Sequence, residues 1–149
     1  MTPATASKTK RRSGPKKTHA SEIAPGVFVG GWKDAEEFAG TRICVLDEAP
    51  DEPLPGMTHL AIYDESKDRA LRANLDKVAD LAIAARRRNE PVILFCGHGI
   101  RRGSLAGAWY LHRAEKLPLD RAFDKVAAVR PQIERPAQWI GDTTGLASD

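Results

Sequence analysis

The chain has 149 residues, of which 42% are hydrophobic and 29% are charged, and its formal net charge at pH 7 is +3. This is the size and balance of one globular domain, and no stretch approaches the ~20 consecutive apolar residues of a membrane span. Two cysteines are too few for a disulfide framework, no Cys/His cluster has zinc-ligand spacing, and the N-terminus lacks the apolar run of a secretory signal. We therefore expect a cytoplasmic protein with free thiols and no membrane span.

The positive charge is concentrated at the N-terminus. The first 20 residues hold six of the 23 Lys and Arg residues and no acidic residue, which leaves 17 basic and 20 acidic residues in 21–149. Polar residues without apolar periodicity predict a disordered basic tail over 1–20, followed by a folded domain over 21–149. Two interpretations of the tail stay open. It is either an arm for an acidic partner or nucleic acid, or a solvated tail without a partner.

Strands and helices are expected to alternate along the body of the chain. Short apolar runs rich in β-branched residues predict strands, and apolar residues at steps of three and four predict helices. In chain order, we expect a strand at 27–30, a short helix at 34–38, a strand at 43–46, a loop at 49–56, a strand at 59–63, a polar loop at 64–68, a helix at 69–88, a strand at 92–95, and helices at 105–113, 119–129 and 136–140. This order predicts an α/β fold with a small, mostly parallel central sheet of about four to five strands flanked by helices.

A glycine-rich loop joins the most apolar strand, 92–95, to the next predicted helix. It consists of Cys96, Gly97, His98, Gly99, Ile100, Arg101, Arg102, Gly103 and Ser104. A strand, a short loop and a helix N-terminus make an anion site, because successive backbone N–H groups point inward. Cys96 begins the loop, and those N–H groups stabilise its thiolate form. Arg102 closes it with a planar guanidinium that holds two phosphate oxygens. The loop therefore favours covalent phosphoryl transfer to sulfur.

Such a transfer needs an acid that protonates the departing oxygen. Asp64, at the end of the third predicted strand, is the candidate, and its carboxylate would then act as base for the attacking water. Periodicity does not separate Asp64 from Glu65 and Asp68, which are equally acidic. The alternative interpretation of Asp64 is a solvated loop acid or a helix cap.

Cys96 and Arg102, with five residues between them, resemble the signature loop of the cysteine-dependent protein tyrosine and dual-specificity phosphatases. The interval from Asp64 to Cys96 is similar to the one between acid and nucleophile in small dual-specificity enzymes. Four more segments resemble the family's opening strand, the short helix after it, the helix behind the loop and the late Arg-Pro motif, namely 23–30, 34–35, 108–111 and 129–136. The resemblance covers residues 22–142, nearly the whole body of the chain.

The resemblance implies a phosphatase that hydrolyses phosphotyrosine, and also phosphoserine or phosphothreonine, in proteins through a phosphocysteine on Cys96. Asp64 would be the acid and then the base. The phosphoryl group would be held by Gly97, His98, Gly99, Ile100, Arg101 and Arg102. No metal or other cofactor is expected, because backbone N–H groups and Arg102 supply the positive charge. The expected partner is a phosphorylated protein.

The sequence departs from the family at three positions. Phe95 stands where a histidine usually organises the loop, and Ala137 replaces an asparagine that often follows the late proline. Gly103 stands where the family has a hydroxyl residue, which eases departure of the thiolate when phosphocysteine breaks down. We expect Ser104, one place later, to do this from a shifted position, or turnover to be slow.

Two alternatives for the function stay open. His98 and Arg101 favour a polyanionic substrate, and the loop also resembles that of RNA 5′-triphosphatases in the same superfamily. Phosphoinositides and glycan phosphates are further candidate substrates. Those RNA enzymes do not depend on an acid placed like Asp64, which counts against this alternative. The second alternative is a catalytically weak, phosphate-binding pseudophosphatase, which the altered Phe95 and Gly103 favour.

The second cysteine, Cys44, lies on a predicted inner strand. It is interpreted as a small core residue. A reversible disulfide with Cys96 under oxidants is the alternative.

Overall fold

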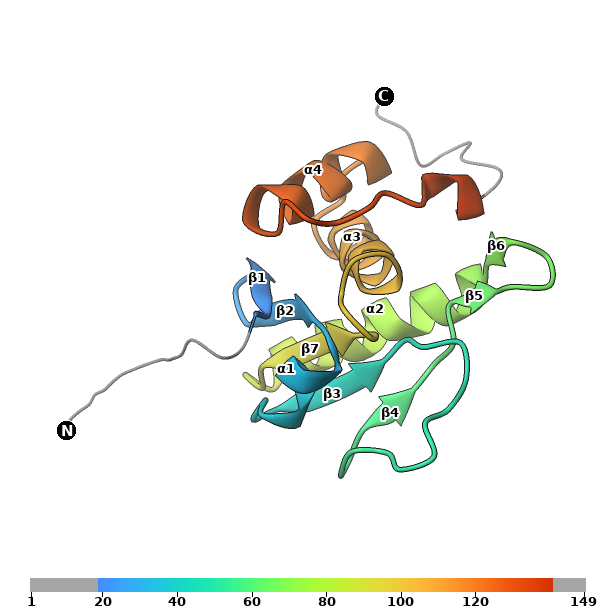
Figure 1. Cartoon of the computed structure of the whole chain (residues 1–149). Helices are drawn as coiled ribbons and strands as arrows, with labels where there is room; N and C mark the ends of the chain where they lie inside the picture. Colours follow the sequence, from blue (N-terminus) through green and yellow to red (C-terminus); the bar gives the residue numbers. More distant parts are fainter. Residues whose placement is uncertain (1–18, 141–149) are drawn as a thin grey trace.

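The computed structural model describes residues 19–140, whose centre is a five-stranded sheet with the order β1-β2-β7-β3-β4 (Figure 1). The strands are β1 (Ser21–Ala24), β2 (Val27–Gly30), β3 (Thr41–Cys44), β4 (Thr58–His59) and β7 (Val92–Phe95). Only β1 runs antiparallel to its neighbour. The predicted mostly parallel α/β sheet is therefore confirmed. Residues 1–18, with most of the basic tail predicted over 1–20, and 141–149 lie outside the described residues.

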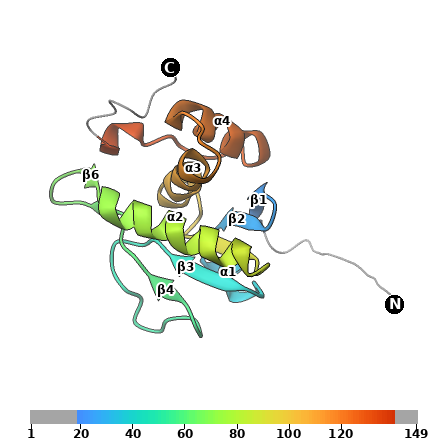
Figure 2. The same ribbon diagram turned by 180° about the vertical axis from the view of Figure 1, so that it is seen from behind.

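Helices cover both faces of this sheet. They are α1 (Trp32–Glu36), α2 (Arg72–Arg87), α3 (Arg102–Ala114) and α4 (Leu119–Val129), followed by the short 3-10 helix η1 (Ala137–Ile140). Side chains alternate across β7, so Val92 and Leu94 face the larger core with α2 and α3, whereas Ile93 and Phe95 face a smaller cluster with α1. Figures 1 and 2 show α3 between α2 and α4. Within 19–140, no helix is long and apolar enough to cross a membrane.

Local patterns predicted three elements with the bounds that the structure has. These are β2, β7 and α4. The first helix begins two residues earlier than predicted, because the Asp34 carboxylate accepts a hydrogen bond from Gly31 N (2.8 Å) and so places the helix N-cap at Gly31. The helix after the glycine-rich loop also begins earlier, at Arg102.

The predicted strand over 59–63 is wrong. Only Thr58 and His59 join the sheet, as β4, and the chain then leaves it. β5 (Tyr63–Asp64) pairs instead with β6 (Arg69–Ala70) in a separate two-stranded hairpin. Between the two sheets, the carbonyl oxygen of Ile62 accepts a hydrogen bond from Leu71 N (2.8 Å), which directs this backbone toward the start of α2 rather than toward β3.

The two cysteines lie on opposite faces of the sheet. Cys44 is the register partner of Phe95 and belongs with it to the smaller cluster. Cys96, one residue further along, belongs to the larger core. Both thiols are free, so the hypothesised disulfide is not present in this conformation.

Candidate active site

The glycine-rich loop lies at the carboxyl end of the central strand β7 and leads directly into α3. Cys96 is 6% exposed, and its Sγ accepts hydrogen bonds from Gly99 N (3.1 Å) and Gly103 N (3.3 Å). Two backbone donors aimed at one sulfur stabilise negative charge on it. The sulfur therefore lies inside a turn with two backbone N–H groups directed at it.

Close packing against β2 explains one glycine of the loop. Gly99 has a φ of +68°, and a Cβ atom there would lie 2.7 Å from the carbonyl carbon and oxygen of Gly30. Gly31 also packs closely on the loop, because a Cβ atom there would lie 2.6 Å from the carbonyl oxygen of Gly97. Trp32 N donates to the same carbonyl oxygen (3.1 Å). A side chain at Gly99 would push the loop off the sheet edge, so this position requires glycine.

Arg130, at the end of α4, holds the loop from behind. Its side chain is buried, with Nε 2.9 Å from the carbonyl oxygen of Gly99 and Nη2 2.9 Å from that of His98. Its Nη1 donates to Ser21 Oγ (3.0 Å) and to the carbonyl oxygen of His19. Burial lowers the pKa of Arg130. Because the carbonyls face Arg130, the N–H groups of the same turn are free to face Cys96.

Arg102 pairs with a residue that sequence analysis missed. Its Nε lies 2.6 Å from Asp47 Oδ1 and its Nη2 lies 2.7 Å from Asp47 Oδ2, a two-pronged ion pair. This pairing raises the pKa of Arg102. The rings of Tyr63 and Trp139 stack on each other, with centroids 4.0 Å apart, and these centroids lie 5.1 and 5.6 Å from Arg102 Cζ. Asp47 follows β3, whose carboxyl end adjoins that of β7. Ligand sites of open α/β sheets lie at the carboxyl ends of the strands, and this rule is the signal that could have found Asp47.

Asp64 does not face the loop in this conformation. Its Oδ1 accepts hydrogen bonds from Ser66 Oγ (2.7 Å) and Ser66 N (3.0 Å), and these contacts lower the pKa of Asp64. Tyr63, the preceding residue of β5, has its ring against Arg102. Because neighbouring side chains of a strand point to opposite sides, Asp64 is directed away from Arg102.

Ser104 is fully buried one helical residue beyond Gly103. Its Oγ lies 2.9 Å from the carbonyl oxygen of Arg101 and 2.7 Å from that of Glu134. The hydroxyl therefore joins α3 to the segment after α4. A contact between this hydroxyl and Cys96 would require it to turn away from both carbonyls.

The loop opens into a pocket of about 310 Å³. The residues that line it are Leu46, Cys96, Gly97, His98, Ile100, Arg101, Arg102 and Glu134. The structure thus brings together most of the predicted phosphate-binding residues around the sulfur. Glu134 adds a negative charge at the rim, where its carboxylate pairs with Arg101 (3.2 Å).

Two of the three departures, Phe95 directly before the loop and Gly103 near its end, have clear structural settings. Phe95 is fully buried and meets Trp32 edge to face, with ring centroids 5.6 Å apart. It offers no polar group to the loop. A Cβ atom at Gly103 would lie 3.5 Å from Cys96 Sγ and 3.3 Å from Val29 Cγ1. Position 103 is therefore the one from which a hydroxyl would reach the sulfur.

Comparison with known proteins identifies similar sequences and structures over most of the chain. No protein-family model matches the chain. Human dual specificity phosphatase 28 is 30% identical over 127 residues, which cover 78% of this chain and 72% of that protein. The crystal structure of the same human protein superposes with a TM-score of 0.67 at 25% identity, over 77% of this chain and 83% of that one. A crystal structure of PTPMT1 in complex with PI(5)P matches with a TM-score of 0.68 at 18% identity, over 80% and 89%, a likeness of fold.

Proposed function

The chain belongs to the dual specificity phosphatases, and we propose that it hydrolyses phosphotyrosine, and also phosphoserine or phosphothreonine, in proteins through a phosphocysteine on Cys96. The position of Cys96 Sγ carries this proposal. It lies at the floor of a pocket, within hydrogen-bonding distance of two backbone N–H groups, and the guanidinium of Arg102 lines the same pocket. A nucleophile and donors for the phosphoryl oxygens thus share one small space.

In the first step the Cys96 thiolate attacks phosphorus. The bond from phosphorus to the ester oxygen breaks, and that oxygen takes a proton from Asp64. In the second step water attacks the phosphocysteine and gives its proton to Asp64, which releases inorganic phosphate and restores the thiolate. Arg102 and the loop amides hold the remaining phosphoryl oxygens throughout.

Two side chains must move before this sequence begins. Asp47 occupies the Nε and Nη2 donors of Arg102, so phosphate has to displace that carboxylate or share the guanidinium. Asp64 must leave Ser66, because the contacts with Ser66 lower its pKa, which disfavours the protonated form that an acid needs, and direct it away from Arg102. Substrate binding supplies the driving force for the first movement, since a phosphate carries more charge than a carboxylate.

The catalytically weak phosphate-binding module remains the second candidate. The placement of Asp64 beside Ser66 and the lack of a hydroxyl at Gly103 favour it, because both would slow turnover without weakening phosphate binding. The charge at the pocket rim gives less support to hydrolysis of a polyanionic phosphate such as 5′-triphosphate RNA, because Glu134 pairs with Arg101 there and neutralises its charge.

Replacement of the nucleophile tests the proposal. We expect Cys96→Ser to abolish release of phosphate from a phosphotyrosine peptide, a phosphoserine peptide and 5′-triphosphate RNA, assayed side by side with the unsubstituted chain. Cys44→Ala is the matched control, because Cys44 is a buried thiol on the opposite face of the sheet. Unchanged rates in Cys96→Ser refute the mechanism. Phosphopeptide binding without turnover by the unsubstituted chain would establish the second candidate instead.

The acid role of Asp64 has its own test. Asp64→Asn should slow alkyl phosphates far more than activated aryl phosphates, whose leaving groups need no proton. Ser66→Ala removes the hydrogen bond that contributes most to the lowered pKa of Asp64, so this pKa should rise. Because the acid works protonated, the limb of the pH–rate profile on which activity falls with rising pH should then move to higher pH. Equal slowing of both substrate classes by Asp64→Asn would show that another group is the acid.

A further inference from the structure

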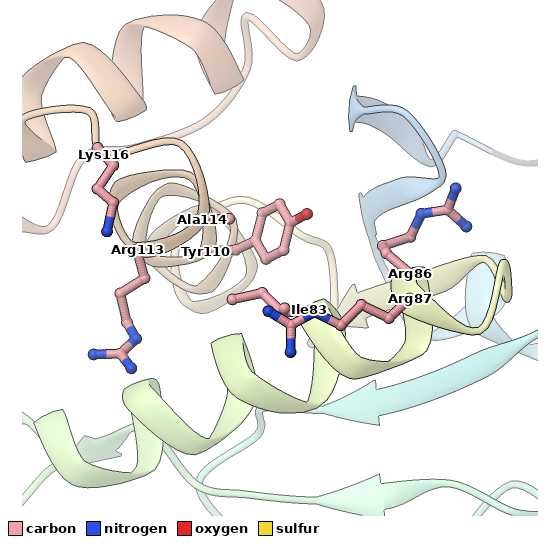
Figure 3. Close-up of a pocket in the computed structure, with 7 residues that line it drawn as sticks. All are labelled: Ile83, Arg86, Arg87, Tyr110, Arg113, Ala114 and Lys116. Carbon is pink, nitrogen blue, oxygen red and sulfur yellow. The ribbon is translucent and has the colours of Figure 1, made fainter.

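A second basic pocket lies between α2 and α3, away from the glycine-rich loop. Its volume is about 390 Å³. It is lined by Ile83, Arg86, Arg87, Tyr110, Arg113, Ala114 and Lys116, which Figure 3 shows as sticks. α3 begins at Arg102 in the active-site loop and ends at Ala114 beside this pocket, so the two pockets lie at opposite ends of one helix.

The cations of this pocket are only partly neutralised. Arg113 pairs with Asp76 (3.2 Å) and Asp80 (3.1 Å) of α2. Within residues 19–140, Arg86, Arg87 and Lys116 form no ion pair with an acidic side chain, and the nearby Glu115 pairs with Lys125 (2.6 Å). Helix dipoles account for cations at the ends of α2 and α3. They do not account for the tyrosine that lies among them.

Tyr110 is 8% exposed, and within the described part of the chain its hydroxyl has no hydrogen-bond partner. Figure 3 shows its ring between α2 and α3, with the hydroxyl on the side where Arg86 lies. A tyrosine hydroxyl is protonated at neutral pH and can donate a hydrogen bond, and burial raises the pKa of Tyr110 further. A buried tyrosine hydroxyl normally has a partner, and phenylalanine would fill the same space without this polar group. This hydroxyl is therefore a donor that is available to an acceptor in the pocket.

We propose that this pocket is a second anion site, separate from the active site, for a small ligand that carries several phosphate groups. Tyr110 donates a hydrogen bond to one phosphoryl oxygen, and Arg87 binds further oxygens with its planar guanidinium group. The guanidinium of Arg86 packs on Gly26 in this conformation, and it joins the ligand by turning from that glycine toward the pocket. Lys116 adds a mobile charge at the opposite side. The pocket volume exceeds what a single phosphate needs, so the chemistry fits a phosphorylated polyol, either free or as the headgroup of a lipid.

Site-resolved binding tests this proposal. Inositol trisphosphate is titrated into the Cys96→Ser variant of the full chain, and amide chemical shifts are followed by NMR. We expect saturable shifts at 110–116 and 83–87 that are distinct from any shifts at 97–102. Vesicles of phosphatidylcholine with phosphatidylinositol bisphosphate form the second arm. If only free inositol trisphosphate binds, the ligand of this pocket is a soluble molecule. If the vesicles bind as well, the pocket accepts the headgroup of a lipid.

Variants assign the binding to this pocket. Tyr110→Phe should weaken inositol trisphosphate binding about tenfold, because a hydrogen bond to a charged group is lost. The thermal midpoint should be unchanged or higher, because the substitution also removes an unpaired buried hydroxyl. The Arg86→Ala/Arg87→Ala double variant should weaken binding further, whereas the charge-matched Lys77→Ala/Arg121→Ala double variant should not. Shifts confined to 97–102, binding in neither arm, or equal weakening by both double variants would overturn the proposal.

Discussion

At the scale of single residues, the feature that most affects the proposed chemistry is the carboxylate of Asp47 on the guanidinium of Arg102. Both side chains are about one-quarter exposed, at 26% and 25%. The pair therefore holds Arg102 in place before any ligand arrives. Asp47 also presents a negative charge to an incoming phosphate, so the residue has two opposing effects.

Asp47→Asn separates these effects. The amide keeps the size of the side chain and one acceptor oxygen for Arg102, but it removes the competing charge. We expect tungstate, as a phosphate analogue, to bind about fivefold more tightly, which corresponds to about 1 kcal/mol for a partly exposed pair. Isothermal titration calorimetry measures this, with Asp124→Asn as a control for loss of a remote surface charge. Weaker binding would mean that orientation of Arg102 outweighs repulsion.

Gly103 supports a second prediction at this scale. Gly103→Ser places a hydroxyl within reach of Cys96 Sγ, and its Cβ requires Val29 Cγ1 to move by only a few tenths of an ångström. We expect breakdown of phosphocysteine to accelerate at least about tenfold, because a hydrogen bond to the departing thiolate stabilises the charge that develops on sulfur. Stopped-flow assays with an aryl phosphate separate the burst from the steady state. Gly103→Ala, which has the same Cβ and no hydroxyl, should not accelerate it.

At the scale of elements, the segment from the end of α4 to η1 acts as a brace for the glycine-rich loop. Arg130 binds two loop carbonyls, and Glu134 N donates to the carbonyl oxygen of Ile100 (2.9 Å). The loop therefore owes its shape to hydrogen bonds from outside as well as to its own glycines. Its short sequence alone would not hold every carbonyl away from the sulfur.

Arg130→Met tests this brace. Methionine has a similar length but no donors, so the carbonyls of His98 and Gly99 lose their buried partner. We expect a loss of about 3 kcal/mol in the free energy of unfolding, measured by urea denaturation, together with weaker tungstate binding. Arg135→Met removes an exposed ion pair with Asp124 and should cost at most about 1 kcal/mol. Equal losses in both variants would refute the special role of Arg130.

The elements also show which parts of the fold the sequence predicts. β7, α4 and the position of Cys96 follow from local patterns, because apolar runs, helical periodicity and a glycine-rich turn are all properties of neighbouring residues. The hairpin of β5 and β6 does not follow, because His59–Tyr63 has the composition of a strand wherever it lies. Its division between two sheets depends on the contact of Ile62 with Leu71.

At the scale of the whole molecule, the residues that sequence reasoning missed share one property. Asp47 lies 55 residues from Arg102 in the chain, and Arg130 lies 31 residues from Gly99. Only the sheet order, which places β3 beside β7, and the packing of α4 on α3 bring them together. Asp64 differs from these residues, because its hydrogen-bond partner, Ser66, is close to it in the sequence. A motif thus located the proposed nucleophile, but not the residues that surround it.

The placement of Arg130 has a consequence for how the protein is made. Synthesis delivers Cys96 well before Arg130, so the thiol leaves the ribosome without the side chain that will turn the loop carbonyls outward. A released chain truncated before residue 130 should show no affinity for oxyanions, although its sulfur and Arg102 are present. We therefore expect the loop to bind phosphate only after α4 has packed on α3, so the thiol should react with substrates only when the fold is nearly complete.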